Sequence, residues 1–147
     1  MSIEFYATGD AFGEFSNFAA FPFALDGVTW PTSEHYFQAE KFEDQEYREK
    51  IRTTASPMIA ARLGRSRKVP IRSDWESVKL DVMRRAVRAK FAAHEALREL
   101  LLSTGDQLLV EAAKGDAFWG TGDDGSGQNW LGRILMEVRD ELREGNE

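Results

Sequence analysis

The stretch from Trp30 to Phe42, WPTSEHYFQAEKF, is the segment around which this 147-residue chain must organise its fold. Pro31 followed by Thr32 is typical of a helix start, because a Thr hydroxyl can accept hydrogen bonds from the free N–H groups of a first turn. Helical periodicity then continues through Phe42. We therefore expect a helix that is capped by Thr32 and extends to Phe42.

Three polar residues of this expected helix share one face. Glu34, Gln38 and Lys41 are spaced at i, i+4 and i+7, and Phe37 and Phe42 flank them. Because solvent-facing stripes are rarely bordered by Phe on both sides, this face resembles the floor of a pocket. Alternatively, Glu34 is a first-turn acid that answers the helix dipole and Lys41 is a surface charge whose stem covers apolar neighbours. The spacing alone does not choose between these interpretations.

Length and composition indicate one globular domain over residues 1–147. With 42% hydrophobic residues, the chain can bury a sizeable core. Its net charge of −6 argues against broad, sequence-blind attraction to nucleic acid, which requires a basic face, although a local basic pocket is compatible with it.

The sequence also excludes several kinds of site. No apolar run approaches the ~20 residues of a membrane span, and the N-terminus has no signal-peptide pattern, so we expect a cytoplasmic protein without a membrane partner. The absence of Cys fits a reducing compartment and excludes thiol chemistry and thiolate-bound zinc. With only His35 and His94 as imidazoles, a multi-His site is excluded too, and we expect no metal and no cofactor.

Local signals predict a series of short elements. Asp26-Gly27 between two β-prone runs indicates a two-residue hairpin turn, and Ser56-Pro57 starts a helix that Gly64 closes. Further elements are expected at 3–6 (strand), 75–93 (helix capped by Asp74), 95–105 (helix stopped by Gly105), 107–112 (strand) and 130–144 (helix capped by Asn129). Together they predict an α+β fold, mostly helix with a small antiparallel sheet.

Two other groups of residues are candidates for substrate contacts. Four Phe between positions 15 and 23, including Phe18, favour core packing, while Ser16 and Asn17 among them can hydrogen-bond a base or sugar edge. A basic cluster follows at Arg62, Arg65, Arg67, Lys68 and Arg72. In an acidic chain it is the best candidate for holding a phosphate, because Arg offers bidentate donors, although for any single Arg a solvated loop is slightly more common.

A Gly-rich loop precedes the last expected helix. Six of the twelve Gly lie between positions 115 and 132, so the backbone must turn tightly or approach another group closely. A Gly-rich loop before a helix is a generic anion cradle, but this one lacks the Lys-Ser/Thr of a P-loop and the dinucleotide fingerprint. Taken alone, Asp123 and Asp124 in this loop are typical turn residues.

The segment FSNFAAFPFALDGVTWPTSEHYFQAEKF resembles the signature of the YbiA-like (NADAR) family of N-glycosidases. Later segments resemble the family as well: SPMIAARLGR, RSDWESVKLDVMRRAVRAKF, and AFWGTGDDGSGQN followed by LG. The resemblance covers almost the whole chain in order, which makes it far more specific than any single short motif. It implies the same helix-rich α+β fold and an N-glycosidase activity.

Cleavage of an N-glycosidic bond passes through an oxocarbenium-like sugar, so the catalyst needs a carboxylate that stabilises this cation or orients water. Glu34 is our candidate for this carboxylate, and the resemblance also implies that Glu34 is essential. The resemblance implies further functional roles for Trp75 and Trp119. Close relatives carry an Asp directly after the Gly that Gly120 matches, where this chain has Thr121. Either a following acid takes that role, with Asp123 favoured over Asp124 because it lies nearer, or the second carboxylate is dispensable.

The remaining expectations concern Lys41 and the substrate contacts. Lys41 could neutralise the leaving base, bind phosphate, or attack the opened sugar as an amine. A first-turn Trp is usually core or rim, but the face of Trp75 could stack on a planar heterocycle. For substrate contacts we predict Asn17, Gln38, Arg65, Arg72, Gly120 and Asn129.

The resemblance implies two kinds of small-molecule substrate. YbiA-like bacterial proteins are associated with hydrolysis of early ribosylaminopyrimidine phosphates of riboflavin synthesis, which releases ribose 5-phosphate. Other NADAR proteins remove ADP-ribose from guanine, so that ADP-ribosylated nucleic acid is also a possible partner, or are linked to NAD metabolism. The single-domain form favours the phosphoribosyl substrate. A third interpretation, a non-catalytic module for ADP-ribose or NAD, predicts binding without turnover.

Overall fold

The computed structural model describes residues 1–145 and divides into two compact units. The central unit is Ala20–Ala93, and the terminal unit combines Met1–Ala19 with the chain from His94 onward. Each unit contains helices and one two-stranded sheet within the described residues, so the predicted α+β class is confirmed.

The central unit begins with the predicted hairpin. β2 (Phe23–Leu25) pairs in antiparallel register with β3 (Val28–Trp30). Asp26 and Gly27 form the turn between them with φ angles of 55° and 82°. Two positive φ angles in succession give the turn type whose twist matches that of a hairpin, and Gly tolerates this conformation without steric cost.

Helix α1 (Ser33–Ala39) follows the hairpin and is buried along its whole length. The Thr32 hydroxyl accepts a hydrogen bond from the His35 amide at 3.1 Å, which confirms the predicted cap. The helix ends at Ala39, so the prediction that it extends to Phe42 is wrong. The backbone beyond it pairs elsewhere: the Lys41 carbonyl accepts a hydrogen bond from the Arg72 amide at 2.7 Å, and Phe42 forms a β-bridge with Ile71.

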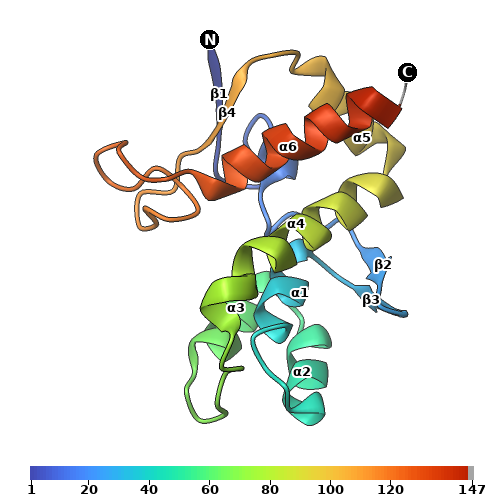
Figure 1. Ribbon diagram of the computed structural model, residues 1–147, viewed down its shortest axis with the longest axis vertical. Helices are drawn as coiled ribbons and strands as arrows, with labels where there is room; N and C mark the ends of the chain where they lie inside the picture. Colours follow the sequence, from blue (N-terminus) through green and yellow to red (C-terminus); the bar gives the residue numbers. More distant parts are fainter. Residues whose placement is uncertain (146–147) are drawn as a thin grey trace. The chain divides into compact units, whose positions relative to one another are not determined.

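Three helices of the central unit contact α1: α2 (Gln45–Arg52), α3 (Pro57–Arg65) and α4 (Trp75–Ala93) (Figure 1). The start of α3 is as predicted, because the Ser56 hydroxyl accepts from the Ile59 amide at 3.2 Å and Pro57 occupies the first turn. Gly64 lies inside α3 instead of closing it. The expectation that Gly64 ends the helix is therefore wrong, and its lack of a side chain has another reason, which the site makes clear.

The terminal unit is built on a parallel pair of strands that the sequence did not reveal. β1 (Ser2–Phe5) pairs with β4 (Leu108–Glu111), so the predicted antiparallel sheet is accompanied by a second sheet of the other kind. Helix α5 (Glu95–Ser103) ends before Gly105, whose φ of 61° fits the predicted stop. Helix α6 (Trp130–Gly145) packs against β4 and α5, and the single turn η1 (Gly13–Phe15) precedes the central unit.

Two expectations for the terminal unit are wrong. Asn129 does not cap α6 with its side chain: its Oδ1 accepts from the Glu111 amide and its Nδ2 donates to the Leu109 carbonyl, both at 2.9 Å. This side chain therefore ties β4 to the start of α6. Phe18 is 39% exposed and does not belong to the core, unlike its neighbour Phe15, which is buried.

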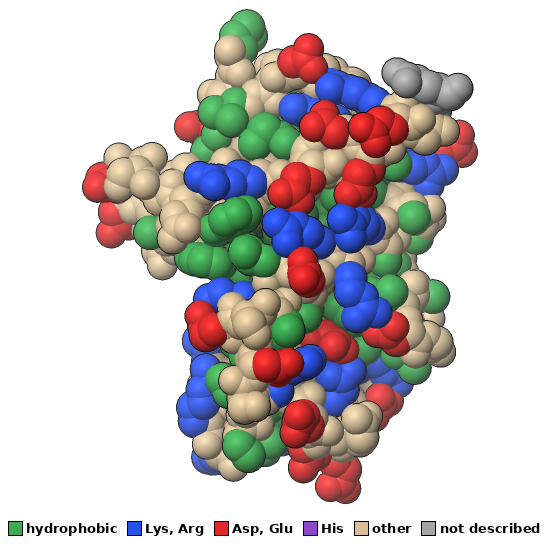
Figure 2. All heavy atoms as spheres, viewed as in Figure 1, with side chains coloured by type: hydrophobic (Ala, Val, Ile, Leu, Met, Phe, Trp, Pro, Cys, Tyr) green, Lys and Arg blue, Asp and Glu red, His purple; other side chains and the backbone are tan. Residues whose placement is uncertain are grey.

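Acidic and basic side chains are interspersed on the face of the molecule seen in Figure 2. No helix between residues 1 and 145 combines the length and apolar character that crossing a bilayer requires.

Candidate active site

Glu34 is a buried carboxylate on the first turn of α1. It is 9% exposed, and one of its oxygens, Oε2, accepts a hydrogen bond from the Gln38 side-chain amide at 2.8 Å. The two residues lie one helical turn apart, so the regular geometry of α1 brings their side chains together. Glu34 is a first-turn acid, as the alternative interpretation had it, and it is buried as the pocket interpretation expects.

Lys41 lies in the turn after α1 and is also only 9% exposed. Its Nζ is 3.5 Å from the Gly64 carbonyl oxygen and 5.8 Å from the centre of the Phe37 ring. Burial lowers the pKa of Lys41 to about 8, against the charge of Glu34, which favours the ammonium form. Arg67 and Arg65 lower this pKa further. The alternative that Lys41 is a surface charge is therefore wrong.

An aromatic pair begins at Phe37, whose ring lies next to Lys41. The rings of Phe37 and Trp75 are 5.1 Å apart between centroids and meet at 61°, and both side chains are buried. Trp75 opens α4, and its neighbour Arg72 is tied through its amide to the carbonyl of Lys41. The central unit thus carries a buried carboxylate on the first turn of α1, and a buried amine and two aromatic rings near the end of this helix.

The basic cluster is less uniform than its sequence indicates. Arg72 makes two hydrogen bonds to the Asp74 carboxylate, at 2.6 and 3.0 Å, and Arg67 donates to the carbonyls of Gly64 and Ser66. Arg65 is exposed and has no hydrogen-bond or ion-pair partner among residues 1–145. Of the two arginines predicted to contact the substrate, Arg65 is therefore more available than Arg72 to bind a phosphate.

The other predicted site residues belong to the terminal unit. They are Asn17, Trp119, Gly120, Asp123 and Asn129. Asn17 is buried, and Gly120 lies so close to the end of β4 that a side-chain Cβ there would be 2.8 Å from the Glu111 carbonyl oxygen. Both polar groups of the Asn129 side chain are already bonded to backbone groups. The close approach of Gly120 is one structural reason for a Gly at this position.

Asp116 holds the backbone that carries Trp119, and sequence reasoning missed it. One Asp116 oxygen accepts hydrogen bonds from the amides of Phe118 and Trp119, at 3.0 and 2.9 Å. The Trp119 and Phe118 rings then meet edge to face, with centroids 4.9 Å apart. An Asp two and three residues before the bonded amides is a common turn signal, and it could have been found in the sequence.

The two acids of the Gly-rich loop differ in their surroundings. Asp124 Oδ1 accepts hydrogen bonds from the Ser126 hydroxyl at 2.6 Å and the Ser126 amide at 3.0 Å, and these bonds lower the pKa of Asp124. Asp123 is exposed and makes no hydrogen bond within the described part of the chain. Thr121, at the position where an Asp was expected, donates from both its amide and its hydroxyl to the Glu111 carbonyl.

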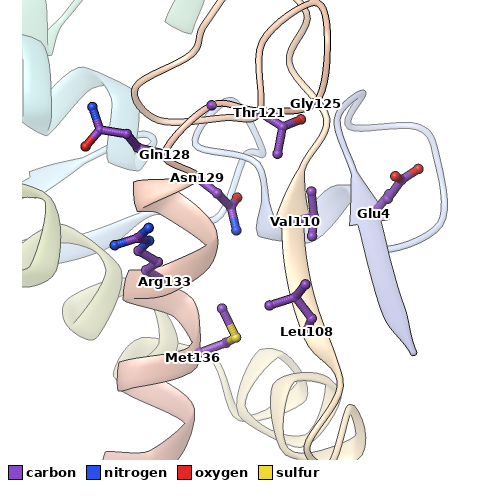
Figure 3. Close-up of a pocket in the computed structure, with 10 residues that line it drawn as sticks. Glu4, Leu108, Val110, Thr121, Gly125, Gln128, Asn129, Arg133 and Met136 are labelled. Carbon is purple, nitrogen blue, oxygen red and sulfur yellow. The ribbon is translucent and has the colours of Figure 1, made fainter.

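A cavity of about 360 Å³ lies in the terminal unit between β4, the Gly-rich loop and the start of α6 (Figure 3). Thr121 and Asn129 line it together with Arg133, whose guanidinium carbon is 4.8 Å from the centre of the Trp130 ring. Among the lining residues within 1–145, Glu4 is the only one that carries a carboxylate. Within residues 1–145, no group of three or more His, Asp or Glu side chains could hold a metal ion.

Comparison with known proteins identifies the family. The NADAR domain family matches residues 4–143. The chain is 59% identical over 140 residues to the N-glycosidase YbiA of Escherichia coli K12, covering 95% of this chain and 88% of YbiA. It is 44% identical over 155 residues to the riboflavin biosynthesis protein PYRR of Zea mays, covering 95% of this chain and 25% of that protein.

The fold is similar to a solved one as well. The NMR structure of E. coli YbiA superimposes with a TM-score of 0.92 at 56% sequence identity, covering 99% of this chain and 89% of the other. Since the family match spans nearly the whole chain and the relatives are far above 30% identity, this chain belongs to the NADAR domain family.

Proposed function

We propose that this protein is an N-glycosidase that hydrolyses the bond between C1′ of a phosphorylated ribose and a nitrogen of a heterocyclic base. The observation that carries the proposal is that two charged side chains of α1 and its following turn are buried: Glu34 on the first turn and Lys41 just after the helix end. The Phe37 ring lies next to Lys41 and packs against Trp75. The name of YbiA, an N-glycosidase, supports the same activity.

In the proposed reaction, the C1′–N bond breaks as positive charge develops on the sugar, and the Glu34 carboxylate stabilises this charge. Water adds to C1′ and loses one proton, while the departing nitrogen gains one, so that the products are ribose 5-phosphate and the free base. A buried carboxylate suits this role because electrostatic stabilisation is stronger where water is excluded.

We assign recognition of the 5′-phosphate to the positive charges of Lys41 and Arg65. Arg65 is exposed, and its charge adds to burial and to the charge of Arg67 in lowering the Lys41 pKa. A bound phosphate would relieve this repulsion between like charges. The aromatic face of Trp75 provides the base contact in this proposal, since planar heterocycles pack well on an indole.

Riboflavin-pathway ribosylaminopyrimidine phosphates are the proposed substrates. Support comes from the maize relative, which is named as a riboflavin biosynthesis protein and contains a segment 44% identical to this chain.

The test incubates the purified protein with ribosylaminopyrimidine 5′-phosphates and, in parallel, with ADP-ribosylated guanosine, and detects released sugar by mass. Ribose 5-phosphate released from the pyrimidine compounds, and lost in Glu34→Gln, is the expected result. Release of ADP-ribose alone would show that the substrate is ADP-ribosylated guanine and not a ribosylaminopyrimidine phosphate. Binding of either compound without any turnover would contradict an enzymatic role altogether.

A further inference from the structure

Gly64 of α3 is seated directly against the side chain of Gln38 on α1. A Cβ at position 64 would lie 1.9 Å from Gln38 Oε1 and 2.6 Å from Gln38 Cδ, far inside any normal contact. The φ angle of Gly64 is not in the left-handed region, so backbone conformation does not require Gly here. The requirement is space for the Gln38 amide.

The space that Gly64 leaves fixes the direction of the Gln38 amide group. Its Nε2 donates to Glu34 Oε2 at 2.8 Å, and its Oε1 is buried without a hydrogen-bond partner among residues 1–145. An amide that accepts no hydrogen bond yet donates one to a carboxylate is aligned by the donated bond and by the wall behind it. That wall is the backbone of α3 at Gly64.

The same glycine also touches the second charge of the site. The Gly64 carbonyl lies 3.5 Å from Lys41 Nζ and accepts a hydrogen bond from Arg67 at 2.9 Å. Gly64 therefore contacts Gln38, which is bonded to Glu34, and also Lys41 itself, although it has no side chain of its own.

We infer that Gln38 and Gly64 are positioning residues: Gln38 holds the Glu34 carboxylate in one orientation, and Gly64 keeps Gln38 in place. This reassigns Gln38 from the substrate contact that its sequence position suggested. The inference rests on the proposed function of Glu34 as the carboxylate that stabilises the transition state.

Gln38→Met tests the first link, since Met is unbranched and of similar length but cannot donate to Glu34. If Glu34 stabilises the sugar mainly in the transition state, misaligning its carboxylate lowers kcat and leaves KM nearly unchanged. Loss of a substrate contact would instead raise KM. We expect kcat to fall about 10- to 100-fold, the usual effect of losing a hydrogen bond to a charged group, at unchanged melting temperature. A raised KM with normal kcat would overturn the inference and restore Gln38 as a substrate ligand.

Gly64→Ala tests the second link, with Gly145→Ala on α6 as the matched control, because a Cβ at Gly145 meets nothing within 4 Å. We expect Gly64→Ala to lower kcat as Gln38→Met does, and Gly145→Ala to match wild type. In Gln38→Ala the amide that lies closest is gone and only the Cβ of residue 38, at 3.0 Å, remains, so adding Gly64→Ala should cause little further loss. Losses that multiply in the double variant would show that Gly64 acts independently of Gln38.

A readout without turnover separates this inference from the proposed function. Carbon-detected NMR titration follows the Glu34 carboxyl, which faces the charge of Lys41. Loss of the Gln38 donor should raise the Glu34 pKa in Gln38→Met and Gly64→Ala but not in Gly145→Ala. If the Glu34 pKa is the same in both variants as in wild type, the inference is overturned, whether or not the enzyme is active. If the Glu34 pKa shifts, the Gln38–Glu34 contact is upheld, even if Glu34→Gln remains active and the proposed function fails.

Discussion

Glu34 and Lys41 are two ionisable side chains that are buried yet keep polar neighbours. Both are 9% exposed, and each has a polar neighbour that satisfies part of its hydrogen bonding. An amine whose pKa is lowered to about 8 changes its charge close to neutral pH, which makes it sensitive to a bound anion.

The arginines of the basic cluster should differ in their effect on phosphorylated substrates. We expect Arg65→Ala to weaken turnover of a 5′-phosphorylated substrate at least tenfold more than that of its dephosphorylated analogue, because Arg65 is unpaired among residues 1–145. Arg72→Ala should do less, since the Arg72 guanidinium is bound to Asp74. Kinetics with both substrates check this, and equal losses on both would contradict a phosphate role for Arg65.

Lys41 should make binding of ribose 5-phosphate depend on pH. With a pKa of about 8 in the free protein, Lys41 is charged below that pH, and a bound phosphate raises the pKa. Affinity is then full below pH 8 and falls as the pH rises above it, while the phosphate keeps its second charge throughout. Calorimetric titration from pH 7 to 10 measures this, with unphosphorylated ribose and Lys41→Arg as controls that should show no such fall. A flat profile for the wild type would contradict the contact.

At the scale of elements, α1 is fixed at its start by a buried histidine. His35 Nδ1 lies 2.8 Å from the Thr32 hydroxyl, and Nε2 lies 3.1 Å from the Thr54 carbonyl, which can only accept. The neutral ring with hydrogen on Nε2 satisfies both contacts. Burial lowers the pKa of His35 below 6.5, against the hydrogen bond to Thr54, which raises it.

This histidine should make the free energy of unfolding depend on pH. Below about pH 6.5 the unfolded chain binds a proton that folded His35 does not, so stability falls as the pH decreases and is full above that value. Between pH 8.0 and pH 5.5, denaturant unfolding should show a larger loss of unfolding free energy for wild type than for His35→Gln. The carboxylates titrate alike in both proteins, so the difference reports His35. Equal losses in both proteins would contradict this account of α1.

The Gly-rich loop should use its two acids differently. Asp124 is engaged with Ser126, so Asp124→Asn should disturb the loop and leave turnover near wild type. We expect Asp123→Asn to impair turnover strongly at unchanged melting temperature if a second carboxylate is needed. Steady-state kinetics of both variants decide this. Normal turnover in both would mean that the enzyme works with Glu34 as its only essential carboxylate.

At the scale of the whole molecule, the negative net charge coexists with a local excess of positive charge around Lys41. Besides burial, which is the largest cause, Arg67, Arg65 and Lys79 all lower the pKa of Lys41, although the chain carries a net charge of −6. Such a distribution suits a small phosphorylated substrate better than an extended nucleic-acid backbone, which needs a basic surface.

Local rules explain which features could be predicted from the sequence. The Asp26-Gly27 turn, the Thr32 cap and the Ser56-Pro57 start depend on a few adjacent residues, and all three are confirmed. The contact between Glu34 and Gln38 was also visible in their spacing, because a helix places such residues on one face. Lys41 lies beyond the end of α1, so the helical spacing does not explain its position.

The features that the sequence did not reveal depend on contacts between distant segments. Gly64 has the pattern of a helix end, and only the approach of Gln38 from another helix explains it. Asn129 resembles a cap until β4 supplies its partners, and the helix over residues 33–39 stops early because the Lys41 carbonyl bonds Arg72. The parallel pairing of β1 with β4 joins strands about one hundred residues apart, which no local signal specifies.

Glu34→Gln, measured by steady-state hydrolysis of a ribosylaminopyrimidine 5′-phosphate, tests the central claim most directly. The substitution preserves shape and removes the negative charge that faces the cationic transition state, with Glu46→Gln on the exposed side of α2 as the control. We predict a loss of ~10²–10³ in kcat at a wild-type melting temperature, and no loss in the control. Activity of Glu34→Gln within a few-fold of wild type would contradict the assignment of Glu34 as the carboxylate that stabilises the sugar cation.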